Sequence, residues 1–308
     1  MGLVLGLGSA AMFGLGAICS RLGMRGRPHD DGLLMSLAIN SIVIAAVLPF
    51  VRLPQWSWEG IVGFVVGGVV GTSLGRGASL KAVRRIGAAR AQAFIVSAPL
   101  YAGIAGWILL GERVSVAQGV GAAIVLVGLA VLIRSRVVAE SLVVVPDGSV
   151  PSAGPGEPRI ETTTGFTYGL LSGVLFGLSF AIRKWATVHY PSAVAGAFLG
   201  AFASFVVVLA SMLIAGRGPA IVRDNLRSIP WWFVAAGVAM SGGLLLQFLA
   251  YLVLSAWLVS LLLGTLGIWT LLWSALFIRE DERIGMDLVA SITLVVIGVG
   301  VIALASAG

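Results

Sequence analysis

The sequence predicts an all-α membrane protein with ten transmembrane helices, arranged as two inverted five-helix repeats. Its mean hydropathy is +1.04 and only 11% of its residues are charged, whereas soluble domains carry about 25% charged residues. Ten apolar stretches reach the roughly 20 residues that a helix needs to cross about 30 Å of hydrocarbon. A ladder of small residues also occurs twice, with the same spacing.

Each ladder places a small residue at every fourth position, which opens a groove along one helix face. Another helix can approach such a groove closely in lipid. The flanking residues repeat as well, because Phe13-Gly14-Leu15 corresponds to Phe176-Gly177-Leu178. Internal repetition of this kind is typical of transporters. The two ladders are Gly2, Gly6, Ala10 and Gly14, and Gly165, Gly169, Gly173 and Gly177.

The expected spans divide evenly between two halves. The charge-free run from Trp231 to Ile278 is too long for one crossing, so it predicts two helices with a turn near Ser255-Ala256. The ten expected spans are 2–20, 32–51, 60–79, 88–110, 114–133, 164–186, 193–215, 231–253, 255–278 and 286–306.

A polar, Pro- and Gly-rich linker separates the two halves. The expected organisation is a first repeat at 1–133, the linker at 134–163 and a second repeat at 164–308. Five spans form an odd number, so the second repeat enters the membrane from the opposite side and is inverted. With the N-terminus outside, sixteen of the twenty Lys and Arg residues lie in the cytoplasm. The positive-inside rule therefore favours both termini outside a cell (inner) membrane.

The stretch from Gly111-Glu112-Arg113 through Gln118 to Gly121-Ala122 resembles the signature of the EamA-type drug/metabolite transporters. A degraded copy begins at Asp281-Glu282-Arg283. The resemblance implies a secondary transporter, an exporter or exchanger, of a small metabolite such as an amino acid or related solute. Family members of this size usually have both termini in the cytoplasm, which differs from the orientation that the charges favour here.

The fourth span of the first half is expected to be broken. Pro99 interrupts the helix in the first half, and a broken helix tends to line a cavity. The second half has Gly267 in that place, so a kink there must come from Gly264 and Gly267.

Polar side chains inside hydrocarbon are the default candidates for a binding site. An alternative is that Ser, Thr, Asn and Gln form hydrogen bonds between helices. Thr72 and Ser73 add polar groups on the third span. The predicted substrate-binding residues are Asn40, Gln92, Ser97, Tyr101, Arg183, Gln247, Tyr251, Ser260, Thr265 and Trp269.

The pair Arg183-Lys184 lies close to a predicted helix end, on the side poor in basic residues. These side chains would either bind an anionic group of a substrate or extend their charges to the membrane interface. The second interpretation is favoured because the helix end is near.

No Asp or Glu lies in the interior of a predicted span, since Asp287 sits at the end of the last one, so no carboxylate is expected deep in the membrane to carry protons. Glu112 is expected to cap or pair at a helix end. The chain therefore favours facilitated exchange, or coupling through a residue at the interface.

An enzyme, a catalytic site, a metal site and a cofactor are not expected. His29 and His189 lie far apart, Cys19 is the single cysteine, and no phosphate-binding P-loop motif occurs. A membrane-embedded lipid-modifying enzyme would depend on the acidic run Glu280-Asp281-Glu282, and a non-transporting membrane subunit is a further alternative. The expected partners are the lipid bilayer and a small-molecule substrate, without nucleic acid. The oligomeric state is open, a homodimer included.

Overall fold

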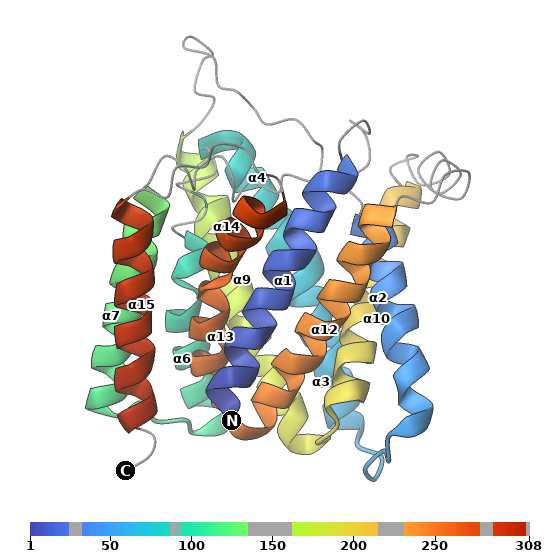
Figure 1. The fold of residues 1–308 in the computed structure, drawn as a ribbon. Helices are drawn as coiled ribbons and strands as arrows, with labels where there is room; N and C mark the ends of the chain where they lie inside the picture. Colours follow the sequence, from blue (N-terminus) through green and yellow to red (C-terminus); the bar gives the residue numbers. More distant parts are fainter. Residues whose placement is uncertain are drawn as a thin grey trace.

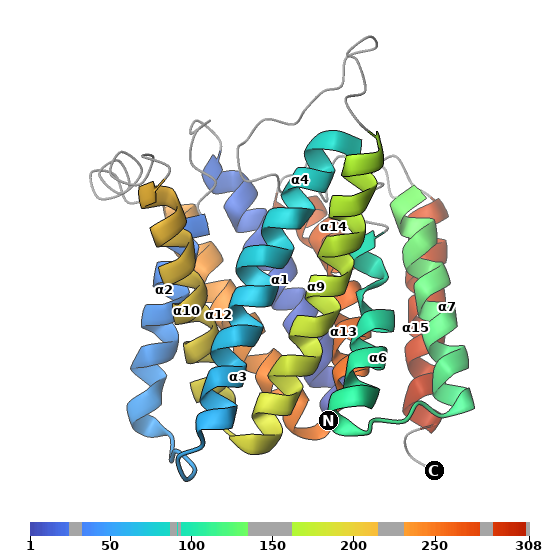
Figure 2. The ribbon, with the colours of Figure 1, turned by 180° about the vertical axis from the view of Figure 1, so that it is seen from behind.

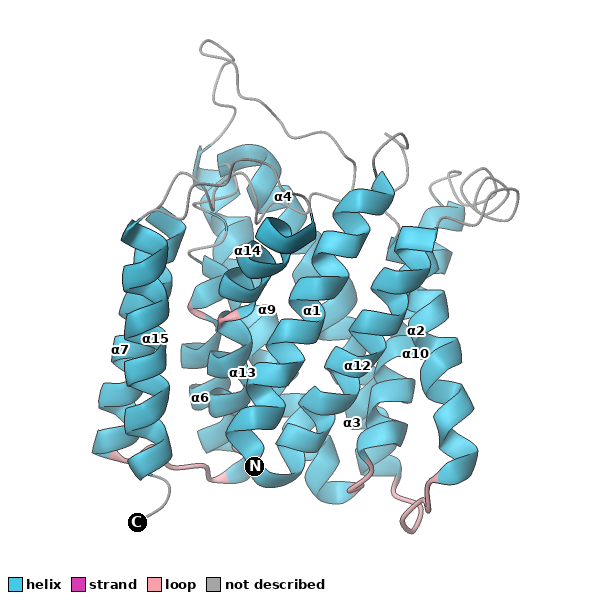
Figure 3. Ribbon diagram, in the orientation of Figure 1, coloured by secondary structure: helices cyan, strands magenta, loops and turns pink. Residues whose placement is uncertain are grey.

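The computed structural model describes residues 1–24, 33–86, 91, 94–134, 162–214, 231–277 and 286–305. Within these ranges the chain is helical and contains no strand, as Figure 3 shows. The longer helices are α1 (Gly2–Met24), α2 (Leu33–Val47), α3 (Trp58–Gly68), α4 (Arg76–Ile86), α6 (Ala98–Leu110), α7 (Val116–Arg134), α9 (Thr162–His189), α10 (Ala193–Ile214), α12 (Trp231–Val253), α13 (Ala256–Gly264), α14 (Leu266–Phe277) and α15 (Met286–Ala305). A short 3₁₀ turn at Leu48–Phe50 follows α2, and a π-helical segment at Val69–Gly75 joins α3 to α4.

Six helical segments are long and apolar enough to cross a membrane, and four shorter apolar helices accompany them in the described ranges. The bundle also leaves large apolar side chains exposed on its outer surface, among them Trp107, Ile108 and Val296. Water would penalise such a surface, whereas lipid accepts it. The chain is therefore a multi-pass membrane protein.

Two sequence predictions about helix ends are confirmed. The charge-free run after Trp231 divides at the predicted turn, because α12 ends at Val253 and α13 begins at Ala256. The second half has a break at Thr265, between α13 and α14, which lies between Gly264 and Gly267, where the sequence placed any kink. The third predicted span, 60–79, agrees with the apolar segment Trp58–Ser79, and helical structure continues beyond it through α4 to Ile86.

The two broken helices have the same local structure. The Ser97 hydroxyl donates to the Phe94 carbonyl, and the Thr265 hydroxyl donates to the Leu262 carbonyl, each over 2.6 Å. Both residues have nearly identical backbone angles, with φ and ψ of −77° and −6° at Ser97 and −72° and −4° at Thr265. The side chains satisfy backbone carbonyls at the break, which is what a helix interruption in an apolar environment requires.

Each glycine ladder packs against a helix from the other half of the chain. A Cβ at Gly14 of α1 would lie 3.0 Å from the Cβ of Trp269, on α14. A Cβ at Gly177 of α9 would lie 2.5 Å from the Cβ of Tyr101, on α6. The first helix of each half therefore rests on the broken helix of the other half. Figures 1 and 2 show that α1 and α9 run in opposite directions, and that α1 begins and α15 ends at the same end of the bundle.

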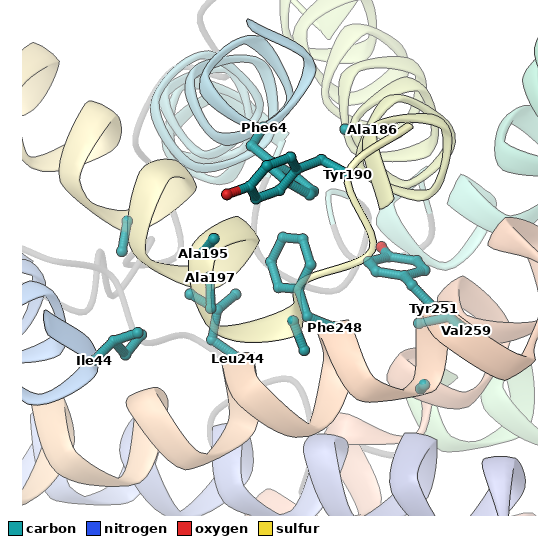
Figure 4. Packing of buried hydrophobic residues seen from close by; sticks show 13 residues of the cluster. Ile44, Phe64, Ala186, Tyr190, Ala195, Ala197, Leu244, Phe248, Tyr251 and Val259 are labelled. Carbon is teal, nitrogen blue, oxygen red and sulfur yellow. The ribbon is translucent and has the colours of Figure 1, made fainter. Parts of the chain in front are cut away.

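A third series of glycines, on α3 and the π-helical segment, faces α9. Gly63 lies against Ala186 and Trp185, Gly67 against Arg183, and Gly71 against Ser179. The aromatic side chains of Phe64, Tyr190, Phe248 and Tyr251 fill the core between α3, α9, α10 and α12, as Figure 4 shows. The close approach of α3 to α9 positions the candidate site described next.

Candidate substrate-binding site

Arg183 is the most unusual side chain in the described part of the chain. It lies within the membrane-spanning helix α9 and is only 9% exposed. One of its Nη atoms donates to the Thr72 hydroxyl over 3.1 Å, and its Nε has no hydrogen-bond partner. No carboxylate of the described residues pairs with it. An ionised group without a counter-charge is costly inside a membrane-spanning segment, so Arg183 is the leading candidate for a binding role.

The glycines of α3 make room for this side chain. The Arg183 stem runs past Gly67, where a Cβ would lie 2.8 Å from the Arg183 Cγ. The Ser179 hydroxyl donates to the Gly67 carbonyl over 2.7 Å and holds α9 against α3. Thr72 lies in the π-helical segment, a type of helix irregularity that is frequent at functional sites.

Two residues of α12 complete the polar group. Gln247 is 2% exposed and Tyr251 is fully buried, and the Gln247 amide donates to the Tyr251 hydroxyl over 3.1 Å. The Arg183 charge lies close enough to the Tyr251 hydroxyl to interact with it electrostatically. We call Arg183, Thr72, Gln247 and Tyr251 the Arg183 cluster.

The favoured prediction that Arg183 and Lys184 extend to the membrane interface is wrong for Arg183. Its face of α9 is covered by α3 and the π-helical segment, so the guanidinium turns inward. Lys184 is half-buried, and its ammonium group donates to the Tyr251 carbonyl over 2.5 Å, near the end of α12. Both charges are therefore held by protein groups.

The other predicted residues do not gather around Arg183. Ser97 and Thr265 bond to carbonyls of their own helices. Tyr101 and Trp269 lie against the ladder glycines Gly177 and Gly14.

Two further predicted residues, Asn40 and Ser260, are buried with oxygen atoms that have no hydrogen-bond partner. Buried polar atoms are normally paired, so these two remain candidates for contact with a polar ligand. Gln92 lies outside the described residues.

Glu112 and Lys184 together hold the connection between α12 and α13. Both oxygens of the Glu112 carboxylate accept from the backbone N–H of Ala256, the first residue of α13, over 2.9 and 3.1 Å. The anion sits at the N-terminus of one helix and the Lys184 cation at the C-terminus of the other, which suits both helix dipoles. The expectation that Glu112 caps a helix end is confirmed, although the helix belongs to the other half of the chain.

The stability contribution of Glu112 is expected to depend on pH. Burial raises the pKa of the Glu112 carboxyl, against the lowering effects of the Ala256 N–H and of Lys184. The folded protein then holds this proton more tightly than the unfolded chain, so the stability falls as the pH rises from about 4.3 through the raised pKa. Melting temperatures of the wild type and of Glu112→Gln between pH 4 and 7 measure this. As the pH rises, the melting temperature of the wild type should fall relative to that of Glu112→Gln. A difference in melting temperature that stays constant with pH would contradict the raised pKa of Glu112.

Comparison with known protein families identifies the first part of the chain. Residues 1–134 match the model of the EamA-like transporter family. The resemblance inferred from the signature is thereby confirmed, and the family consists of membrane transporters of the drug/metabolite superfamily.

Curated proteins and solved structures were also compared with the chain. No curated protein matches the chain. A solved crystal structure is similar over 98% of this chain and 96% of its own, with 17% identity and a TM-score of 0.67, which shows a shared fold.

The EamA signature builds the connections between helices. Gly111 ends α6 with a positive φ of 66°, a conformation that glycine adopts without strain. The next residue, Glu112, donates its backbone N–H to the Gly106 carbonyl and caps α13 with its side chain.

The remaining signature residues start α7. The Ser115 hydroxyl accepts from the Gln118 N–H, and the Gln118 side chain accepts from the Ser115 N–H, which is a reciprocal capping box. Gly121 then meets Gly298 of α15, where a Cβ would lie 2.8 Å from the Gly298 carbonyl oxygen. The signature residues thus fix helix ends and contacts, and the Arg183 cluster lies outside the signature.

Proposed function

We propose that the protein is a secondary transporter, an exporter or exchanger, of a small metabolite such as an amino acid or related solute, in the cell (inner) membrane. The match of residues 1–134 to the EamA-like family carries this proposal. The Arg183 cluster is the proposed binding group, because it concentrates buried polar atoms where α9, α12 and the π-helical segment meet.

The proposed mechanism is alternating access between two inverted five-helix repeats. The crosswise packing of α1 on α13 and α14, and of α9 on α6, supports it, as do the opposite directions of α1 and α9. Ser97 and Thr265 supply matching breaks at which each broken helix could bend. Inverted repeats that rock against each other in this way expose a central site to one side of the membrane at a time.

Flux in liposomes containing the purified protein tests the proposal. Radiolabelled amino acids, sugars, nucleosides and small cations are offered, and uptake is compared with protein-free liposomes. At least one class should show uptake that saturates with concentration and accelerates when unlabelled solute is loaded inside. The absence of saturable uptake for every class would overturn the transport proposal.

A further inference from the structure

We propose that the transported metabolite carries a carboxylate, and that Arg183 binds it. This inference rests on the proposed transport function and adds the chemical class of the substrate. It starts from a mismatch of charge, because Arg183 is buried in a membrane-spanning helix without a carboxylate of the described residues to neutralise it. A bound anion would supply the missing counter-charge.

The hydrogen-bond geometry favours a carboxylate. Thr72 engages only one Nη atom of the guanidinium, and Nε has no partner. A guanidinium presents its N–H groups as a planar fork that matches the two oxygens of a carboxylate. Nearby, the Ser73 hydroxyl is buried without a partner. The Tyr251 hydroxyl accepts from Gln247, which leaves its own O–H to donate.

The charges around the cluster favour an anion with a single negative charge. The neighbouring cation, Lys184, is already engaged by the Tyr251 carbonyl and by the field of Glu112. Arg183 therefore offers one positive charge, which balances one carboxylate. A phosphate monoester carries nearly two negative charges at neutral pH and would leave part of its charge uncompensated.

Matched compounds test the inference on the purified full-length protein. Each amino acid is compared with its carboxamide and with the amine that lacks the carboxyl group, and short-chain carboxylates, inorganic phosphate and a phosphate monoester are included. A carboxylate should raise the melting temperature and enter liposomes, whereas its amide and amine should do neither. Equal effects of the analogues that lack a carboxylate, an effect of phosphates alone, or no effect of any carboxylate would each overturn the inference.

Variants at Arg183 separate binding from folding. Arg183→Met keeps an apolar stem of similar length and removes the charge, and it should weaken carboxylate binding on the order of 100-fold. Arg183→Lys keeps the charge without the planar fork of N–H groups. Its affinity for carboxylates should fall between those of the wild type and Arg183→Met. The exposed residue Arg52 provides the control, because Arg52→Met changes the net charge equally and should retain the preference for carboxylates.

The melting temperature without ligand distinguishes a binding role from a structural one. A buried charge without a partner costs stability, so Arg183→Met should melt at the same temperature as the wild type or higher. A lower melting temperature together with equal loss of all ligands would assign Arg183 a structural role and overturn the inference. Saturable transport of a cation, sugar or amide, unaffected by Arg183→Met, would overturn the carboxylate inference while the transport proposal stands. If the wild-type protein showed no saturable flux for any class of solute, the transport proposal itself would be overturned.

Discussion

Replacing Gly177 with alanine is expected to destabilise the protein strongly. An added Cβ would lie 2.5 Å from the Tyr101 Cβ, 2.7 Å from the Ala98 carbonyl oxygen and 2.8 Å from the Ala102 nitrogen. Two of these three atoms belong to the backbone of α6, so no side-chain rotation relieves the contact. Overpacking of this kind costs about 1–3 kcal/mol. The melting temperature of the purified variant measures it.

Gly300 provides the matched control for this substitution. It also lies within a described helix, α15, but a Cβ there would meet no atom within 4 Å. Alanine favours helix over glycine by about 1 kcal/mol. Gly300→Ala should therefore leave the melting temperature unchanged or raise it. If both variants melted at the same temperature, the close contact between α9 and α6 would be contradicted.

Replacing Glu112 with alanine is expected to have the second largest effect. The Ala256 N–H at the start of α13 would lose its acceptor, a loss that costs about 1 kcal/mol for a helix cap. Lys184 would also lose the nearby negative charge that offsets its burial. A Cβ at residue 112 would remain, but the space beside Gly106 that the carboxylate fills would be left open.

Two variants make this measurement specific. Glu112→Gln keeps an oxygen that can accept from Ala256 and has no charge to bury, so it should retain most of the stability. Glu59→Gln tests the same chemical change at an exposed position and should have little effect. The order of melting temperatures should place Glu112→Ala clearly below the other two. A similar temperature for all three would contradict the role of Glu112 as a cap for α13.

The sequence predicted much of the helical layout because its signals are local. Apolar length indicates a spanning helix, and Gly264 and Gly267 indicated where the second half could kink, which is where the break at Thr265 lies. Small residues at every fourth position predicted a close helix contact in both halves. They could not identify the partner helix, because a groove accepts any apolar helix face. That α1 packs on α14, and α9 on α6, therefore became clear only from the structure.

The candidate site was less predictable because its contacts are distant in sequence. Whether Arg183 turns outward or inward depends on glycines of α3 and on Thr72, 111 residues away. Glu112 meets Ala256 across 144 residues. The nearby helix end favoured an exposed Arg183. In the structure α3 and the π-helical segment cover this side chain, so it is buried instead. Thr72 had a signal, as a polar residue in a Gly-rich span, but nothing in the sequence linked it to Arg183.

Because α1 packs on α13 and α14, and α9 packs on α6, each half is expected to depend on the other for its folding. Either half alone would leave its glycine groove and its broken helix without their packing partners, so we expect neither half to fold by itself. The two halves are therefore related to each other much as the two subunits of an obligate heterodimer are.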